Sequence, residues 1–406
     1  MKLIAALACL IVASRLTIQQ SLTAGIVLSI LLLPVWIVVL RRMRGGMSLL
    51  LLGSLSVVSG AVLTDFFAAN HPTSMSLLQQ NSLAVIGVIG GIGLLVWART
   101  LLGPWTMALW YGVGLLVGVV THGLDFDNVW KFSLSVPVTV IVLAACRLTG
   151  RPALEVAALI GLAVISAMND SRSAGSMLLL AAALVLWQAV GAALSARSST
   201  VRTLAVFGFI GVIGYSALQA FILDGWFGRA AAVRSQEQIS QSGSLLLGGR
   251  PEIGASTELI AVNPFGLGSG TLANGVDLLT AKTGMARLNY DPDNGYVERY
   301  MFGNGFEVHS MLGDLWIRFG PLGAAFLLTL LVVVGVGTAR LVARRQAGGL
   351  TVFLAIQVFW DALFAPFFST SSATLMLAVA LTLVARPDSA VPERTRASAF
   401  VSFQRS

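Results

Sequence analysis

Charged residues are scarce in this chain: they make up 11% of its 406 residues, whereas hydrophobic residues make up 56%. Soluble globular domains carry about 25% charged residues, so the composition excludes a soluble fold and indicates an integral membrane protein. The mean hydropathy of +0.84 agrees with that class. Long apolar runs therefore account for most of the expected structure.

Cysteine is nearly absent as well, and the two cysteines present, Cys9 and Cys146, both lie in apolar runs. They lack the spacing of metal ligands, and neither can form a disulfide within an exposed loop. The first residues, Met1 to Val12, carry one lysine ahead of a short apolar stretch. We interpret this start as an uncleaved membrane helix rather than a signal peptide.

The net charge of +8 could indicate a nucleic-acid partner, but the distribution of the arginines argues against one. They occur in short clusters between apolar runs, as in the cytoplasmic loops of membrane proteins. The clusters are Arg41-Arg42-Met43-Arg44, Arg147 with Arg151, Arg197 with Arg202, Arg340 with Arg344-Arg345, and Arg394 with Arg396. The expected surroundings are membrane lipid, with no nucleic acid.

A membrane-spanning helix needs about 20 mostly apolar residues, and the sequence contains about twelve such segments. They cover residues 3–18, 21–40, 47–64, 82–98, 104–121, 132–146, 152–168, 174–195, 203–223, 312–339, 350–367 and 371–385. If Arg41–Arg44 is cytoplasmic, alternation places both termini and every arginine cluster inside. The expected fold is an all-α polytopic membrane protein of the bacterial cytoplasmic membrane.

The same count divides the chain into four parts. Residues 1–223 form the first nine spans, 224–311 one large extracytoplasmic loop, 312–385 the last three spans, and 386–406 a disordered cytoplasmic tail. Between Asp224 and His309 the loop has six basic and nine acidic residues, so it is polar and slightly acidic. We expect this loop to carry the chemistry.

Local patterns within the loop predict its elements. They indicate a helix over 231–247, a break at Gly248–Pro251 and a short helix over Glu258–Val262. The glycine-rich turn Phe265–Gly270 could cradle a phosphate, although it lacks the Lys-Ser/Thr pair and the preceding strand of a P-loop. Asp291–Gly295 departs from the spacing of an EF-hand, so we interpret it as a turn.

The three histidines, His71, His122 and His309, all fall on the predicted outer side. His309 shares a helical face with Leu312, Trp316 and Phe319, on a helix that continues into a membrane span. A neutral imidazole at the membrane surface can remove a proton from a sugar hydroxyl, so His309 is the candidate catalytic residue. Farther along the same helix, Asp314 and Arg318 are spaced four residues apart and are expected to pair.

Two arginines and one aspartate are candidate substrate-binding residues. Arg172 lies in a polar link on the outer side, where an arginine is explained by pairing with Asp170 or by binding an anion. Arg250 follows two glycines, which let a large ligand come close. A guanidinium holds phosphate oxygens bidentately, so both suit a diphosphate. Asp361 lies within a predicted helix, where it either pairs with a loop arginine or accepts hydrogen bonds.

Two other functions compete with this interpretation. A metal-dependent transferase that uses lipid-phosphate sugars would employ acids and a histidine at outer helix ends, namely Asp65, His122, Asp125 and Asp127. A transporter or flippase of lipid-linked glycans would place charged residues at mid-membrane and keep its loops short. The predicted helices here are nearly free of charge at their centres, and the polar groups gather in one long loop.

Three motifs occur in a characteristic order between about Ala153 and Leu330. They are Ser171-Arg172-Ser173-Ala174, then Gly249-Arg250 followed by Asn263-Pro264-Phe265-Gly266-Leu267-Gly268, and finally His309-Ser310-x-Leu312 ending in Gly320-Pro321-Leu322-Gly323. With these motifs the chain resembles the O-antigen ligase and O-antigen polymerase superfamily of bacterial envelope glycosyltransferases. Ser173 stands where that family usually has glycine, Ser310 where asparagine is common, and 282–307 has no counterpart.

The resemblance implies a glycosyltransferase-C-like fold and transfer of a preassembled oligosaccharide from undecaprenyl diphosphate to an acceptor hydroxyl. It implies inversion at the anomeric carbon without a metal or another cofactor. Arg172 and Arg250 would then hold the diphosphate, and His309 would activate the acceptor. The implied partners are the lipid-linked donor, a glycan or glycolipid acceptor and, for a polymerase, a chain-length regulator.

Overall fold

The structure is a computed structural model, which describes residues 1–19, 21–193, 250–303 and 305–386, together with Val233, Gln236 and Ile239. It is mostly helical, with one short hairpin. The first half contains α1 (Lys2–Ser14), β1 (Thr17–Gln19), β2 (Leu22–Thr23), α2 (Ala24–Leu31), α3 (Leu33–Arg41), α4 (Gly46–Phe67), α5 (Met75–Leu102), α6 (Pro104–His122), η1 (Val129–Leu134), α7 (Ser135–Leu148), α8 (Pro152–Met168) and α9 (Arg172–Ala193). The second half contains α13 (Glu252–Val262), α14 (Gly275–Ala286), η2 (Val297–Met301), α15 (Met311–Ala343), α16 (Gly349–Phe364) and α17 (Ser371–Thr382).

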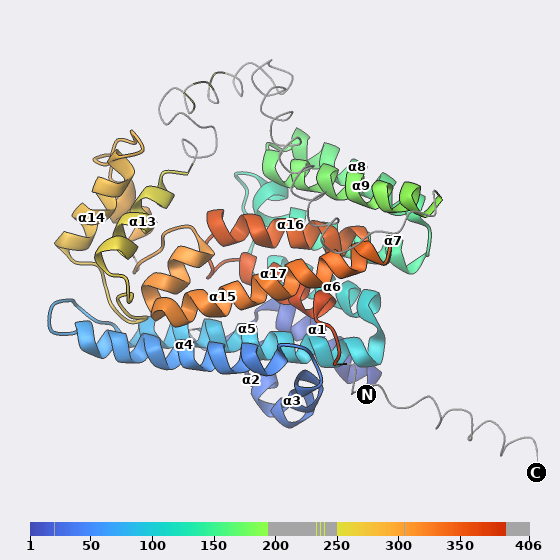
Figure 1. The fold of residues 1–406 in the computed structure, drawn as a ribbon, viewed down its shortest axis with the longest axis horizontal. Coiled ribbons are helices and arrows are strands. Elements are labelled where there is room, and N and C mark those ends of the chain that lie inside the picture. Colours follow the sequence, from blue (N-terminus) through green and yellow to red (C-terminus); the bar gives the residue numbers. More distant parts are fainter. Residues whose placement is uncertain are drawn as a thin grey trace, which may run out of the picture.

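Six helices in the described part are long and apolar enough to cross a membrane, or seven if the bent pair α2 and α3 forms one span. Four more apolar helices, α1, α8, α16 and α17, have between 10 and 17 residues. The chain is therefore a multi-pass membrane protein. Helices α4, α5 and α15 run side by side along the bundle, while α13 and α14 lie at one end, on the left in Figure 1.

Several helix boundaries differ from the sequence-based expectation. Helix α1 ends at Ser14, and the segment 21–40 is two helices that meet at an angle of 73°. The bend lies at Leu32, two residues before Pro34, which lies in the first turn of α3 and has no N–H to continue α2. The predicted span 203–223, most of the helix predicted over 231–247, and the tail from residue 387 lie outside the described residues.

Helix α15 is broken near its start. Gly320 has the non-helical angles φ 68° and ψ −161°, and Pro321 follows it. A proline has no N–H, so the carbonyl of Ile317, four residues earlier, has no donor within the helix. Leu267 donates to that carbonyl at 2.6 Å and Gly268 at 3.3 Å. The break thus supplies the acceptor on which the glycine-rich turn docks.

Five of the six backbone N–H groups of the glycine-rich turn, those of residues 266–270, donate to acceptors within the protein. Gly266 donates to the carbonyl of Asn263 at 2.9 Å, and Ser269 donates to that of Gly60 at 3.1 Å. Gly270 donates to the hydroxyl of Thr64 at 2.9 Å. With Leu267 and Gly268 bound to α15, only the N–H of Phe265 is left without a partner among the described residues, and a single N–H group does not form an anion cradle. The phosphate-cradle alternative is therefore wrong, and these glycines serve close packing against α4 and α15.

Gly268→Ala is expected to lower the free energy of unfolding by about 1–3 kcal/mol. The residue has φ +110°, and an added Cβ would lie 2.4 Å from the backbone nitrogen of Thr64. Gly275→Ala is the matched control, because nothing lies within 4 Å of its Cβ and its backbone is not left-handed. Thermal unfolding in detergent measures both variants. Equal unfolding temperatures would show that the turn is not packed as described.

The polar segment at this end has its own small core. Gly254 of α13 and Gly284 of α14 touch, since a Cβ on Gly254 would lie 2.2 Å from the carbonyl oxygen of Gly284. Around this crossing the buried apolar residues include Leu259, Met285, Val308 and Ile317. The core therefore joins the two loop helices to the residue before His309 and to the first turns of α15.

Candidate functional site

His309 lies in the extended segment that leads into α15, directly before the capping residue. Ser310 is the N-cap, with its hydroxyl accepting from the Gly313 N–H at 3.2 Å and donating to the carbonyl of Ala362 at 3.1 Å. His309 has φ 50°, in the left-handed region, and is half-buried. The expectation that it shares a helical face with Leu312 was wrong, because the helix begins two residues after it. Its Nδ1 is buried and has no hydrogen-bond partner.

Asp314 and Arg318 hold the segment before His309 in place. Asp314 is fully buried, and its two carboxylate oxygens accept from the N–H groups of Val308 and Phe367, each at 2.9 Å. Arg318 donates through Nη2 to the carbonyl of Phe306, and its guanidinium lies 4.0 Å from the ring centroid of Phe368.

The two side chains therefore do not form the ion pair that their spacing predicted. Desolvated backbone N–H groups compete for the carboxylate of Asp314, and a buried carboxylate is stabilised when such donors satisfy it. Together Asp314 and Arg318 join the strand-like stretch 306–308 to the connection between α16 and α17. We call this pair the clamp.

Glu252 and Tyr296 lie beside His309, and sequence reasoning did not single out either one. The Tyr296 ring centroid is 6.4 Å from that of His309. The Tyr296 hydroxyl donates to Oε1 of Glu252 at 2.6 Å, while Oε2 of Glu252 is buried and has no partner. Burial raises the pKa of the Tyr296 phenol, and the hydrogen bond to Glu252 raises it further. The phenol therefore remains a donor at physiological pH.

Tyrosines form an aromatic surface next to His309. Tyr300 stacks on Tyr296 with ring centroids 5.6 Å apart and planes at 29°, and it is 69% exposed. Tyr290 meets Tyr296 edge-on at 6.2 Å. Three of the five tyrosines in the chain are thus gathered within this cluster. Their concentration between residues 290 and 300 was the sequence signal that could have revealed the surface.

Arg250 lies immediately before Pro251 and α13 and is half-buried. Its charge interacts electrostatically with Tyr296 and with Asp361. In the part of the chain that the structure covers, its guanidinium forms neither a hydrogen bond nor an ion pair. Arg250 therefore keeps its five donors available for an anion.

Asp361 lies in the last turns of α16 and is 3% exposed. Its Oδ1 accepts from the Gln357 amide at 2.8 Å, and its Oδ2 accepts from the Thr374 hydroxyl at 3.4 Å. The alternative in which Asp361 accepts hydrogen bonds is the one observed, from α16 and α17; with Arg250 it interacts electrostatically but forms no ion pair among the described residues. Asp361 connects the membrane helices to the polar segment.

Arg172 begins α9, at the link from α8. Its Nε lies 3.4 Å from Oδ1 of Asp170, and the two side chains are 29% and 54% exposed. An exposed pair of this kind contributes little energy and leaves the outer nitrogens of the guanidinium available. Neighbouring Ser171 and Ser173 line a cavity of about 440 Å³ that Gln357 also lines. Gln357 donates to Asp361, which interacts electrostatically with Arg250, but neither Arg172 nor Arg250 lines this cavity.

The acids of the metal-dependent alternative are not gathered into a ligand set. Asp65, Asp125 and Asp127 are exposed, and Asp125 accepts from the N–H of Asp127 at 3.0 Å within its own loop. His122 bonds through Nδ1 to the carbonyl of Gly118 at 2.8 Å. Among the described residues, no group of three or more His, Cys, Asp and Glu has the arrangement of a metal site.

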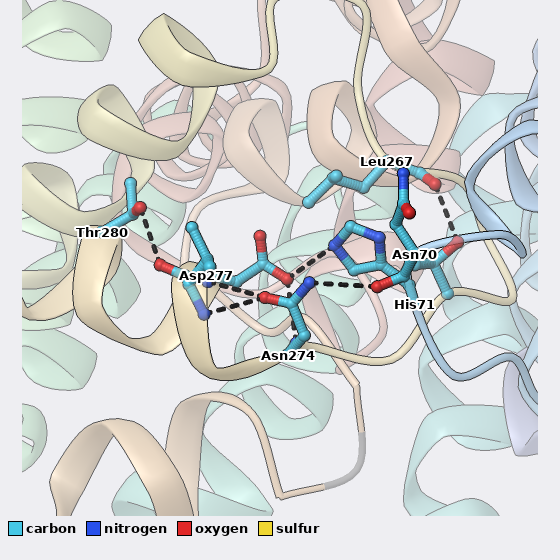
Figure 2. Close-up of polar contacts among 8 residues, drawn as sticks. Asn70, His71, Leu267, Asn274, Asp277 and Thr280 are labelled. Carbon is cyan, nitrogen blue, oxygen red and sulfur yellow. Dashed lines mark hydrogen bonds and ion pairs between the residues drawn. The ribbon is translucent and has the colours of Figure 1, made fainter.

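His71 joins the α4–α5 connection to α14, as Figure 2 shows. Its Nε2 lies 3.0 Å from Oδ2 of Asp277, and both side chains are largely buried. Asp277 also accepts from the N–H of Asn274, whose amide donates to the carbonyl of Asn70 at 3.3 Å. Because the carboxylate faces Nε2, that nitrogen carries the proton. This histidine holds the polar segment on the bundle through Nε2. Among the described residues, the Nδ1 atoms of both His71 and His309 are buried without a hydrogen-bond partner, and only His71 is fixed by an ion pair.

Comparison with protein-family models finds no matching family, and comparison with curated proteins and with solved structures finds no similar protein. The function must therefore be argued from the geometry of the site and from the motifs in the sequence.

Proposed function

We propose that the protein is a glycosyltransferase that transfers or polymerises an oligosaccharide from undecaprenyl diphosphate onto a glycan or glycolipid hydroxyl. In this proposal the chain spans the bacterial cytoplasmic membrane about twelve times, and the segment 224–311 faces outward between the ninth and tenth spans. The reaction is inverting and uses no metal. The observation that carries the proposal is an unpaired arginine, Arg250, beside the tyrosine that contacts His309.

The groups at the site suit each part of that reaction. His309 removes the proton from the acceptor hydroxyl, and the oxygen then attacks the anomeric carbon of the donor. The bond from that carbon to the diphosphate breaks, and the leaving diphosphate takes the electron pair. Arg172 and Arg250 compensate its developing negative charge, while Asp361 orients Arg250. Undecaprenyl diphosphate and the extended glycan are the products.

The tyrosine cluster suits the acceptor. Aromatic faces provide rigid apolar area, and their hydroxyl edges remain wet, so they bind amphipathic rings. Tyr300 is exposed and stacked on Tyr296, which contacts the His309 ring. A sugar resting on Tyr300 would therefore present a hydroxyl to the imidazole.

The proposal is tested with purified protein in vesicles that contain a lipid-diphosphate oligosaccharide, with excess EDTA present. Glycan transfer and release of undecaprenyl diphosphate are the expected results. A glycolipid acceptor and a second molecule of the donor, supplied in separate assays, distinguish ligase from polymerase activity. Loss of transfer in EDTA, restored by a divalent cation, would replace the proposal with the metal-dependent alternative.

Arg250→Gln is expected to reduce kcat/KM for the lipid-diphosphate donor by about 10²–10³-fold, because one donor to the developing charge is lost. Arg250→Lys should recover only part of the activity, since an ammonium cannot bind two phosphate oxygens in the same way. Arg287→Gln is the control, because Arg287 is 66% exposed and pairs with Glu258. Equal kcat/KM values for Arg250→Gln and the wild type would remove Arg250 from the diphosphate site.

A further inference from the structure

A second cavity of about 510 Å³ lies among α1, α2, α5, α6 and the α16–α17 connection. Arg15, the residue after α1, lines it together with His122 at the end of α6. None of the described residues around this cavity is acidic. A cavity with a permanent cation and no carboxylate favours an anionic ligand.

The charge of Arg15 lacks compensation. Across the described ranges, its guanidinium forms no ion pair and no hydrogen bond. The position at the carboxyl end of α1 gives a favourable interaction with the helix dipole. That contribution is smaller than the cost of withdrawing a cation from water, so the dipole alone does not account for the residue. A charge held near the membrane without a partner indicates a ligand site.

The backbone at Arg15 adds a second observation. Arg15 has φ 52°, in the left-handed region. Helices often end with such a residue, but glycine or asparagine usually occupies the position because a larger side chain is strained there. Arg15 therefore combines an unfavourable backbone with an uncompensated charge. Both costs are offset if the side chain binds an anion in the cavity.

The rest of the lining is divided between hydrogen-bonding and apolar side chains. The polar members include Thr17, Ser21, Thr23, Gln80, Thr370 and Ser372. The apolar members include Ile26, Leu83, Val88, Leu115, Val119 and Met376. Hydroxyl and amide donors suit phosphate oxygens, whereas the apolar wall suits a hydrocarbon chain. Inorganic phosphate needs far less than this volume and would leave the apolar wall unused.

A second guanidinium lies close by. Phe368 lines the cavity, and Arg318 lies 4.0 Å from the centroid of its ring. Nε and Nη1 of Arg318 are buried and have no hydrogen-bond partner. The clamp thus places the Arg318 guanidinium behind the cavity wall, where it also interacts electrostatically with Asp314 and Glu307.

We propose that this cavity binds the phosphate group of a membrane lipid, with Arg15 as the anion-binding residue and the apolar wall against the first part of the chain. Neither Arg172 nor Arg250 lines this cavity, although Phe132 lines both it and the cavity beside Ser171. The site does not depend on the proposed transferase, because it requires neither a donor glycan nor turnover.

The test uses full-length protein in phosphatidylcholine vesicles that contain a photoactivatable phosphatidic acid, with the diazirine in the acyl chain near the headgroup. Photoactivatable diacylglycerol, the same lipid without phosphate, is the matched probe. After irradiation, labelled peptides are mapped by mass spectrometry. Phosphatidic acid should label α1 and α6 at least tenfold more than diacylglycerol does.

Arg15→Gln should remove that difference, and Arg15→Lys should retain part of it. Labelling near Arg41–Arg44 is the internal control and should not change in either variant. Equal labelling of α1 and α6 by the two lipids in the wild type would overturn the proposal without any variant. So would labelling that survives in a folded Arg15→Gln protein. Displacement of the lipid by millimolar inorganic phosphate would show a free-phosphate site instead.

Discussion

His309→Ala is expected to reduce glycan transfer by about 10²–10⁴-fold, the range that a positioned general base contributes. The imidazole is half-buried beside the Tyr296 ring, and its Nδ1 has no hydrogen-bond partner among the residues that the structure describes. A ring without a structural hydrogen bond at that nitrogen is available to exchange a proton with a substrate. The measurement is the single-turnover rate with a lipid-diphosphate oligosaccharide and saturating acceptor.

The design of this experiment must separate catalysis from folding. His122→Ala is the matched control, because His122 is an exposed histidine that bonds within its own helix. It should leave the transfer rate unchanged. The unfolding temperature of His309→Ala should remain within a few degrees of the wild type, since removing His309 breaks no hydrogen bond at Nδ1. An active His309→Ala protein would overturn the assignment of the base.

Asp314→Ala is expected to lower the free energy of unfolding by about 3–5 kcal/mol, the cost of removing one member of a buried charged arrangement. The carboxylate accepts from two backbone N–H groups, and its removal leaves those groups and buried Arg318 without their acceptor or counter-charge. Thermal unfolding in detergent gives the magnitude. Asp125→Ala, at an exposed loop position, should change stability by less than about 0.5 kcal/mol.

The clamp also makes a prediction about activity. Asp314→Asn keeps an oxygen acceptor for one N–H group but loses the negative charge, so it should destabilise less than the alanine variant. Because Asp314 bonds to Val308, the residue before His309, both variants should lower kcat more than they raise KM for the donor. An unfolding temperature equal to that of the wild type in Asp314→Ala would contradict the role of the clamp.

The helices could be predicted from the sequence because an apolar run long enough to span a membrane can form few structures there other than a helix. Where a predicted span was broken, the cause was a proline and its immediate neighbours. The proline at position 34 divided one predicted span into α2 and α3, and Gly320 with Pro321 broke α15. Both prolines are plain in the sequence. Their consequences depend on which neighbouring groups donate hydrogen bonds to the carbonyls left without a helical donor. A single sequence does not show which groups these are.

The candidate site was predicted in its residue types but only partly in its contacts. Arg250 and Asp361 were named separately, and the structure brings their charges together across more than a hundred residues of sequence. The spacing of Asp314 and Arg318 predicted an ion pair, because local spacing cannot reveal that Val308 and Phe367 offer competing donors. The sequence analysis missed three residues for the same reason, because their contacts depend on tertiary packing: Glu252, Tyr296 and Arg15.

The docking of the glycine-rich turn on the broken start of α15 also constrains the order of biogenesis. The turn residues 266–270 find two acceptors, Gly60 and Thr64, on a helix that is inserted early. The acceptor of Leu267 and Gly268, the carbonyl of Ile317, is synthesised about fifty residues later. During translation the turn therefore cannot complete its hydrogen bonds until α15 has been synthesised and packed against it. A chain that stalls before α15 is inserted would expose the glycine-rich turn to proteases. The insertion of α15 therefore completes the assembly of the segment that precedes it.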